Sequence, residues 1–340
     1  MPRAFYAAGM NQHFASAQEA ARRGPLFIVM NAGSGRHDAD ETRQIIAGVL
    51  DAAGREHEFL LVKQAAEIQD IAQAAVARAR ERGGVVVAAG GDGTISAVAH
   101  AVLGSGCPFG VLPQGTFNYF GRAHAIPQDA ETATRALLAA GIELVQVGQV
   151  NGQVFLVNAS VGLYPKLLED REAYKRQFGR SRLVAFVAGL ATLLQWRGQL
   201  RLQTETAAET ATGTPAKIAM LRTPTLFVGN NHLQLDRVGI EQEDADAVEL
   251  GYLAAIVVRP IGTLALLGLL LRGLLGRLGD AEHIRSFTFR HLTVSPRGMR
   301  RIKVATDGEV QWMRTPLVFE VATEPLLLLV PAPADQAEVA

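Results

Sequence analysis

The chain has 340 residues, 49% of them apolar, and its 33 basic and 33 acidic residues give a formal net charge of zero. This length favours two domains, the apolar content excludes global disorder, and the neutral balance argues against broad electrostatic capture of nucleic acid. The single cysteine, Cys107, excludes an internal disulfide and a multi-cysteine metal site. It also fits a reducing compartment, so we expect a cytoplasmic protein.

The first part of the chain alternates predicted strands and helices. Apolar strands are expected near residues 25–31, 57–63, 85–90 and 109–113, with helices near residues 40–53, 65–83, 96–103 and 129–140. Continuous apolar strands that alternate with helices are typical of a parallel sheet covered on both faces. The sequence therefore predicts a parallel α/β domain at the N-terminus, over residues 24–141.

The pattern changes near Ile142, where short strands follow one another with turn signals at close spacing. This pattern indicates an antiparallel, sandwich-like β domain over residues 142–332. A threonine-rich stretch at 204–217 is expected to be a loop or a hairpin end. Exposed edge strands in this domain would allow a homodimer.

One apolar segment, Ile261 to Gly279, is interrupted by Arg272 and Arg277 and is too short to span a bilayer comfortably. We expect a helix there, either buried against the β domain or facing a membrane surface. The basic stretch Arg171 to Arg182 leaves the same two interpretations open. Transient contact with the inner face of a membrane is therefore one expectation.

Three loops of unusual composition follow predicted parallel strands: NAGSGR from Asn31, GGDGT from Gly90, and LPQGTFNYFGR from Leu112. Ligands of open parallel sheets bind beyond the carboxyl ends of the strands. Glycines let backbone amides approach a ligand, and helix N-termini favour phosphate. Thr94 can cap the following helix or bind a phosphate oxygen. No loop has the Walker A spacing, so Asp92 is free to bind magnesium or to accept a proton.

GGDGT, followed about twenty residues later by LPQGTFNYFGRAHAIP, resembles the catalytic domain of the diacylglycerol kinase superfamily. That superfamily includes bacterial soluble lipid kinases and the sphingosine and ceramide kinases. NAGSG, the Asp-Gly-Glu of VATDGEV and the final PLLLLVP stand in the family's order, so the resemblance covers residues 25–331. It implies a nucleotide-binding domain like those of NAD kinase and phosphofructokinase, followed by a lipid-binding β domain. The implied activity is ATP- and Mg²⁺-dependent phosphorylation of a lipid hydroxyl, such as that of diacylglycerol.

The resemblance also implies site residues. The catalytic carboxylates would be Asp92, Asp307 and Glu309, with Asp92 and Asp307 also near the metal, and it leaves open which of these two takes the proton. The residues around ATP would be Asn31, Ser34, Gly35, Gly90, Gly91, Gly93, Thr94, Gly115, Thr116 and Asn118.

The sequence departs from the family pattern at Phe117 and Tyr119, whose bulk could reshape the entrance to the site, and at Glu249-Leu250-Gly251, which replaces an Asp-Gly. The latter change argues against a peripheral metal site. NAD kinase is a weaker alternative because the chain has no Asn-Glu pair. Two alternatives stay open: a sphingosine- or ceramide-type kinase, and a catalytically weak lipid-binding regulatory protein.

Overall fold

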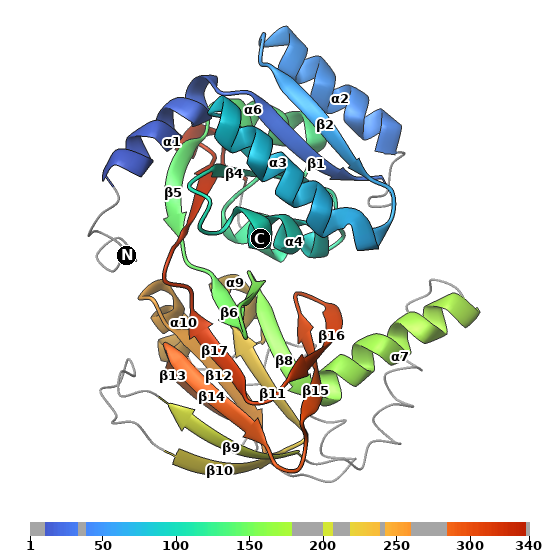
Figure 1. Cartoon of the computed structure of the whole chain (residues 1–340), viewed down its shortest axis with the longest axis vertical. Coiled ribbons are helices and arrows are strands. Elements are labelled where there is room, and N and C mark those ends of the chain that lie inside the picture. The colour runs from blue at the N-terminus through green and yellow to red at the C-terminus, as the bar shows by residue number, and fades with distance from the viewer. Residues whose placement is uncertain are drawn as a thin grey trace. The chain divides into compact units, whose positions relative to one another are not determined.

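The chain folds into two compact units, Met1–Val147 with Ala322–Ala340 (unit 1) and Gly148–Val321 (unit 2). Figure 1 shows the ribbon of this computed structural model. The structure describes residues 11–32, 39–178, 200–206, 218–238, 242–259 and 284–337.

Unit 1 is built on a sheet with the strand order β2-β1-β3-β4-β18-β5. Its strands are β1 (Leu26–Asn31), β2 (His57–Val62), β3 (Val85–Gly90), β4 (Pro108–Pro113), β5 (Gly141–Val145) and β18 (Leu326–Val330). Neighbouring strands from β2 to β18 run parallel, and β5 pairs antiparallel with β18. Strands β3, β4 and β18 are buried along their whole length, as continuous apolar runs predict.

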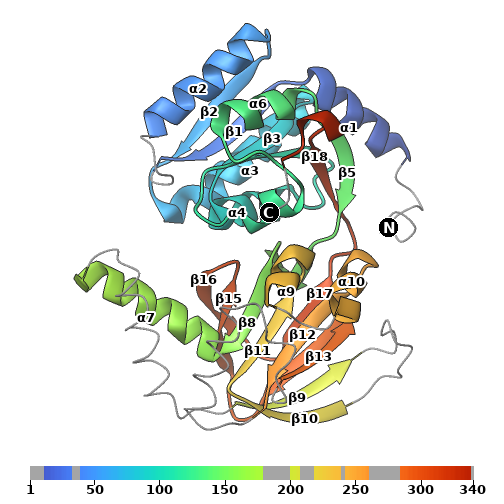
Figure 2. The ribbon, with the colours of Figure 1, turned by 180° about the vertical axis from the view of Figure 1, so that it is seen from behind.

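Helices cover both faces of this sheet. They are α1 (Asn11–Arg23), α2 (Ala39–Ala52), α3 (Ile68–Arg82), α4 (Asp92–Val102), α5 (Tyr119–Ala123) and α6 (Ala130–Leu138), with short 3-10 turns at Ala65–Glu67 and Pro333–Asp335. Helices α2 and α6 contact each other, and so do α3 and α4. Figures 1 and 2, seen from opposite sides, show α3 and α4 over one face of the sheet and α6 over the other. The predicted parallel α/β domain is confirmed.

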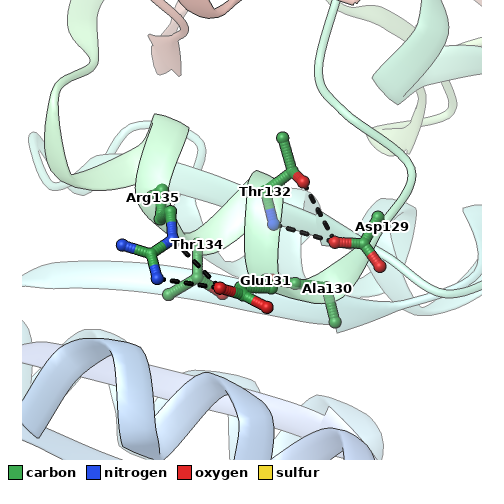
Figure 3. A network of polar contacts seen from close by, with 6 residues as sticks. All are labelled: Asp129, Ala130, Glu131, Thr132, Thr134 and Arg135. Atoms are coloured by element: carbon green, nitrogen blue, oxygen red, sulfur yellow. Dashed lines mark hydrogen bonds and ion pairs between the residues drawn. The ribbon is translucent and has the colours of Figure 1, made fainter.

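Helix α6 begins with a side-chain cap, drawn in Figure 3. Asp129 Oδ1 accepts hydrogen bonds from the backbone nitrogen and the hydroxyl of Thr132, each at 3.0 Å. One turn on, Arg135 Nη2 pairs with Glu131 at 2.8 Å. An aspartate cap and an i,i+4 ion pair both stabilise a helix start. The cap and the ion pair therefore fix the start of α6, where the segment that follows the third predicted loop ends.

Unit 2 is a sandwich of two antiparallel sheets, ordered β10-β9-β14-β17-β6-β7 and β13-β12-β11-β8-β15-β16. The first consists of β6 (Gly148–Val150), β7 (Gln153–Phe155), β9 (Leu200–Thr206), β10 (Ile218–Thr223), β14 (His291–Pro296) and β17 (Leu317–Val321). The second consists of β8 (Asn158–Gly162), β11 (Thr225–Gly229), β12 (Leu253–Val258), β13 (Ile284–Phe289), β15 (Arg301–Thr306) and β16 (Glu309–Arg314). Phe155, Phe289 and Phe319 are fully buried in the core shared by the two sheets. This confirms the predicted antiparallel domain.

Three helices accompany the sandwich: α7 (Leu163–Phe178), α9 (His232–Val238) and α10 (Gln242–Glu249). Helices α9 and α10 pack on β11, β12 and β13, around the buried Leu235. No helix among the described residues has the length and hydropathy needed to cross a membrane. The segment 261–279, most of the stretch 204–217 and part of the basic stretch 171–182 lie outside the described residues.

The two units differ from the predicted domains 24–141 and 142–332 at both ends of the second range. Strand β5 and strand β18 belong to the sheet of unit 1, because β18 pairs with β4 and with β5. The chain therefore returns to its first unit after Val321. Hydropathy along the chain cannot show such a return, since a buried strand looks alike in either sheet.

Candidate functional site

The second and third predicted loops meet at the carboxyl ends of neighbouring strands in unit 1. Gly90 ends β3 and pairs with Pro113, which ends β4. Beyond this pair, the backbone nitrogen of Gln114 donates to the carbonyl oxygen of Gly90 at 2.8 Å. The first loop begins at Asn31, at the end of β1, but Ser34 and Gly35 lie outside the described residues.

Close packing explains two of the glycines. A Cβ on Gly115 would lie 2.8 Å from the Cα of Gly91, and a Cβ on Gly90 would lie 2.7 Å from the Cβ of Thr94. Both distances are too short for real carbon contacts, so a side chain at Gly115 would push against the backbone of Gly91, and one at Gly90 would displace the Thr94 side chain. The glycines thus let the main chains of the two loops pack closely, and α4 begins where they meet.

Thr94 lies inside α4 rather than at its cap. Helix α4 begins at Asp92 and its N-cap is Gly91, so the predicted helix start at residue 96 and the interpretation of Thr94 as a cap are wrong. The Thr94 side chain is buried, and Asn31 Nδ2 donates to its hydroxyl at 3.3 Å. This bond joins the first loop to the second, and it brings two predicted site residues together.

Asn118 shapes the third loop. Its Oδ1 accepts from the backbone nitrogen of Gly115 at 2.8 Å, and its Nδ2 donates to the Gly115 carbonyl at 3.0 Å and to Gln128 Oε1 at 2.7 Å. The residue is 4% exposed and has a left-handed backbone with φ of 49°. Asparagine tolerates that conformation better than most residues. Its amide holds the loop, while the neighbouring Thr116 is exposed.

Asp92 is partly buried at the first position of α4. Its Oδ1 accepts from the backbone nitrogen of Phe120 at 3.4 Å. Burial raises the pKa of Asp92, against the opposing effect of the Phe120, Tyr119 and Asn118 amides and the charge of Arg122. A carboxylate with a raised pKa is a stronger base. Asp92 therefore binds a proton more readily than an exposed aspartate does.

Asp307 lies in unit 2, at the two-residue turn between β15 and β16. Its carboxylate accepts from three backbone nitrogens, those of Leu156 (2.7 Å), Val157 (2.9 Å) and Asn158 (3.0 Å). With φ of 47° at Asp307 and 92° at Gly308, this Asp-Gly turn matches a tight hairpin. Glu309 follows on β16 and is exposed. The geometry gives Asp307 a structural duty that its sequence motif did not reveal.

Burial explains the shifted pKa values of three other titratable side chains. Burial lowers the pKa of His124 to about 4, and its ring packs edge-on against Phe120 with centroids 4.7 Å apart. Burial also lowers the pKa of His100 and raises that of the Cys107 thiol. Within the described residues no group of three or more His, Cys, Asp or Glu side chains could hold a metal.

Gln114 is a candidate site residue that our sequence reasoning missed. Its amide nitrogen and oxygen are both buried, and neither has a hydrogen-bond partner among the described residues. Unpaired buried amides are rare in native proteins and call for an explanation such as a ligand. The sequence did contain a sign of this residue's role, because Gln114 is a polar residue between the apolar end of β4 and the glycine of the third loop.

Residues 25–150 match the family model described as the diacylglycerol kinase catalytic domain. These residues are therefore similar in sequence to a diacylglycerol kinase catalytic domain. The match includes all three loops and Asp92, but it ends before Asp307 and Glu309. The predicted family resemblance is confirmed.

Curated relatives agree with this match. A diacylglycerol kinase of Bacillus subtilis is 32% identical over 146 residues, which is 42% of this chain and 47% of that protein. A probable lipid kinase, YegS-like, of Citrobacter koseri is 31% identical over 124 residues, or 35% of this chain and 42% of that protein. The chain thus matches less than half the length of these relatives.

Solved structures extend the likeness of fold to nearly the whole chain. A diacylglycerol kinase structure from Bacillus anthracis has a TM-score of 0.61 at 17% identity, and covers 92% of this chain and 98% of its own. A second structure from that organism has a TM-score of 0.65 at 20% identity, with the same coverage. At this identity the likeness shows the two-unit fold, and it includes unit 2, most of which lies beyond the family-model match.

Proposed function

We propose that this protein is a lipid kinase, which transfers the terminal phosphate of ATP to the hydroxyl of a lipid such as diacylglycerol. The proposal rests chiefly on one observation: two glycine loops pack against each other around Asp92, inside the stretch that matches the kinase domain. The names of the relatives give the substrate class. Such a lipid resides in a bilayer, so the proposal includes transient contact with a membrane surface.

The phosphates of ATP would lie against the main chain of Gly90 to Gly93 and of Gly115 to Thr116. Helix α4 starts at this point, and the free amides of a helix N-terminus attract anions. The Asn118 amide preserves the loop shape that this contact requires. Phe117 is 52% exposed and its ring is parallel to that of Tyr119, so it offers an apolar surface beside the glycines.

Asp92 is our candidate for the general base. As the lipid hydroxyl oxygen bonds to the terminal phosphorus, its proton passes to the Asp92 carboxylate, and the bond to ADP breaks with its electrons leaving on ADP. The raised pKa of Asp92 favours this proton transfer. Mg²⁺ also fits, because it typically takes one or two carboxylates plus substrate phosphates, and Asp92 is the matching oxygen donor here. Bound with ATP, the ion would supply charge neutralisation.

The bonding of Asp307 favours a second candidate, the catalytically weak lipid-binding regulator. Three backbone amides already occupy its carboxylate, so it has fewer lone pairs left for a metal ion or a substrate than its motif suggests. This candidate would bind lipid and ATP without turnover.

Phosphate transfer from labelled ATP to a lipid panel separates the two candidates. The panel contains diacylglycerol, sphingosine and ceramide, each with Mg²⁺. We expect labelled lipid from wild type, none from Asp92→Asn, and normal product from Asp70→Asn, since Asp70 is an exposed carboxylate on α3. No product from any lipid, alongside normal ATP binding, would select the regulator.

A further inference from the structure

One end of unit 2 gathers exposed arginines. Strands β14 and β15 are joined there by the turn 297–300. The backbone nitrogen of Arg297 donates to the carbonyl oxygen of Arg201, in β9, at 2.8 Å. Figures 1 and 2 show this turn at an end of the sandwich, beside the start of β9. We call this end the arginine tip, and its exposed arginines are Arg201, Arg222, Arg297, Arg300, Arg301 and Arg314.

Four of these arginines face one another in pairs across neighbouring strands. In the register of β9 and β10, Arg201 lies directly opposite Arg222, and in that of β15 and β16, Arg301 lies opposite Arg314. The residues next to them in each strand pack in the core of unit 2, so the arginines point outward. Like charges directly opposite each other destabilise a sheet. Two such pairs at one end of the fold indicate an anionic partner that neutralises them.

The described residues offer these arginines no counter-charge. None of the six forms an ion pair in the described part of the chain. Glu205 of β9 and Glu309 of β16 lie near the opposite ends of their strands. Glu169 of α7 is already bound to Lys303, whose Nζ lies 2.6 and 2.7 Å from its two carboxylate oxygens. The arginine tip therefore keeps a local positive charge, although the whole chain is neutral.

Two large apolar side chains are exposed among these charges. Met299, in the turn, is 44% exposed, and Trp312 of β16 is 57% exposed. Because strand side chains alternate, Trp312 shares the outer face of its sheet with Arg314. The turn is tight, since the Met299 nitrogen donates to the Pro296 carbonyl at 3.4 Å and Gly298 has φ of 76°. Met299 is therefore exposed on an ordered turn.

We propose that the arginine tip docks on an anionic membrane surface, with its guanidinium groups on lipid phosphates and with Met299 and Trp312 among the headgroups. Arginine binds phosphate in a bidentate manner, and basic residues are attracted to the negative surface of a membrane. Apolar side chains that enter the headgroup layer add to such binding. Duplex nucleic acid would engage the arginines alone and leave Met299 in water. The inference deepens the membrane contact of the proposed function, on which it rests, but it concerns binding and not phosphate transfer.

Vesicle sedimentation tests the arginine tip without ATP. The full chain is mixed with vesicles of phosphatidylcholine alone or of phosphatidylcholine with phosphatidylglycerol. We expect wild type to bind the anionic vesicles at least about tenfold more tightly, and added salt to remove most of this difference. Equal binding to the two kinds of vesicle would overturn the proposal.

The double variant Arg297→Gln, Arg300→Gln removes two charges and keeps the main-chain bonds of the turn. Its affinity for anionic vesicles should fall about tenfold or more, with an unchanged melting temperature. The matched control is Arg78→Gln with Arg135→Gln, which changes the net charge equally at two exposed arginines of unit 1 that pair with glutamates. It should bind anionic vesicles as wild type does. An equal loss in both double variants would mean a general charge effect and would overturn the tip.

Two single variants separate docking from folding and from nucleic-acid binding. Arg301→Gln relieves the repulsion with Arg314, so its melting temperature should stay equal or rise while its affinity for anionic vesicles falls several-fold. A lower melting temperature with unchanged vesicle binding would make Arg301 structural and contradict the proposal. Met299→Gln should weaken vesicle binding at high salt as well as low. If it has no effect, and duplex DNA competes with the vesicles, the tip binds nucleic acid instead.

Two acceptors keep this inference separable from the proposed function. Dioctanoylglycerol is presented dissolved in water, and dioleoylglycerol is presented in anionic vesicles. The Arg297→Gln, Arg300→Gln variant should phosphorylate the dissolved lipid as wild type does and the vesicle lipid at least about fivefold more slowly. A protein without kinase activity that still prefers anionic vesicles would overturn only the proposed function. An active kinase whose vesicle binding ignores both substitutions would overturn only the arginine tip.

Discussion

Asp307 Oδ2 lies 2.7 Å from the backbone nitrogen of Leu156, a residue 151 positions earlier in the chain. Together with the bonds to Val157 and Asn158, this contact fastens the β15–β16 turn to the segment between β7 and β8. A return bond from the Asp307 nitrogen to the Asn158 carbonyl, at 2.9 Å, completes the link. The carboxylate thus has a structural role, because it joins these two segments of unit 2 by hydrogen bonds.

Replacing Asp307 by alanine should therefore weaken the fold. Three backbone amides lose a charged acceptor, and we expect a loss of about 3 kcal/mol or more in the free energy of unfolding. Asp307→Asn keeps one acceptor oxygen and should recover part of that loss. Urea denaturation followed by circular dichroism measures both. Glu309→Ala, at an exposed neighbour, should change stability by less than about 0.5 kcal/mol. Equal stabilities for wild type and Asp307→Ala would rule out this structural role of Asp307.

Asp92 should make the stability of the folded protein depend on pH. Because burial raises its pKa, the folded protein holds the proton where the unfolded chain, with an ordinary pKa near 3.8, has lost it. Wild-type stability should therefore fall as pH rises from about 3.8 through the raised pKa. Asp92→Asn removes this loss, so its stability advantage should grow through that window and persist at pH 7. Urea denaturation between pH 3 and 7 measures the difference. An advantage that shrinks with rising pH contradicts the assignment.

Gly115→Ala should disturb the contact between the second and third loops. The added Cβ would lie 2.6 Å from Asn118 Oδ1 and 2.8 Å from the Cα of Gly91. We expect a loss of about 1–3 kcal/mol in stability and weaker binding of ATP by calorimetry. Gly48→Ala is the control, because nothing lies within 4 Å of its Cβ in the middle of α2. It should gain up to about 1 kcal/mol and bind ATP normally.

Gln114→Leu tests the residue that sequence reasoning missed. If the unpaired Gln114 amide serves the nucleotide, its removal should raise the Kd for ATP about five- to tenfold, and thermal stability should stay equal or increase. Gln73→Leu, an exposed change on α3, should leave the Kd unchanged. Normal ATP binding by Gln114→Leu, with a higher melting temperature, would mean that the Gln114 amide destabilises the fold and does not bind the nucleotide.

The sequence alone determined the two-part architecture and the glycine loops. Both depend on local chemistry: continuous apolar strands predict a buried parallel sheet, and glycines followed by a helix start predict exposed amides. Asp92 was found for the same reason, because the glycines and the threonine that mark it lie within two residues of it in the sequence. The domain ends could not be found this way, because β18 joins β4 only through pairing across more than 200 positions.

Only the tertiary structure decided what the individual side chains do. Asp307 and its three amide donors lie about 150 positions apart, and the Asn31–Thr94 bond joins loops 63 positions apart. The side chains of Gln114, Asn158 and Ser160 have atoms without partners among the described residues, which becomes visible only once their neighbours are in place. Residue type and spacing show which groups could react or bind. Whether a group is already bonded depends on neighbours that folding brings from distant parts of the chain.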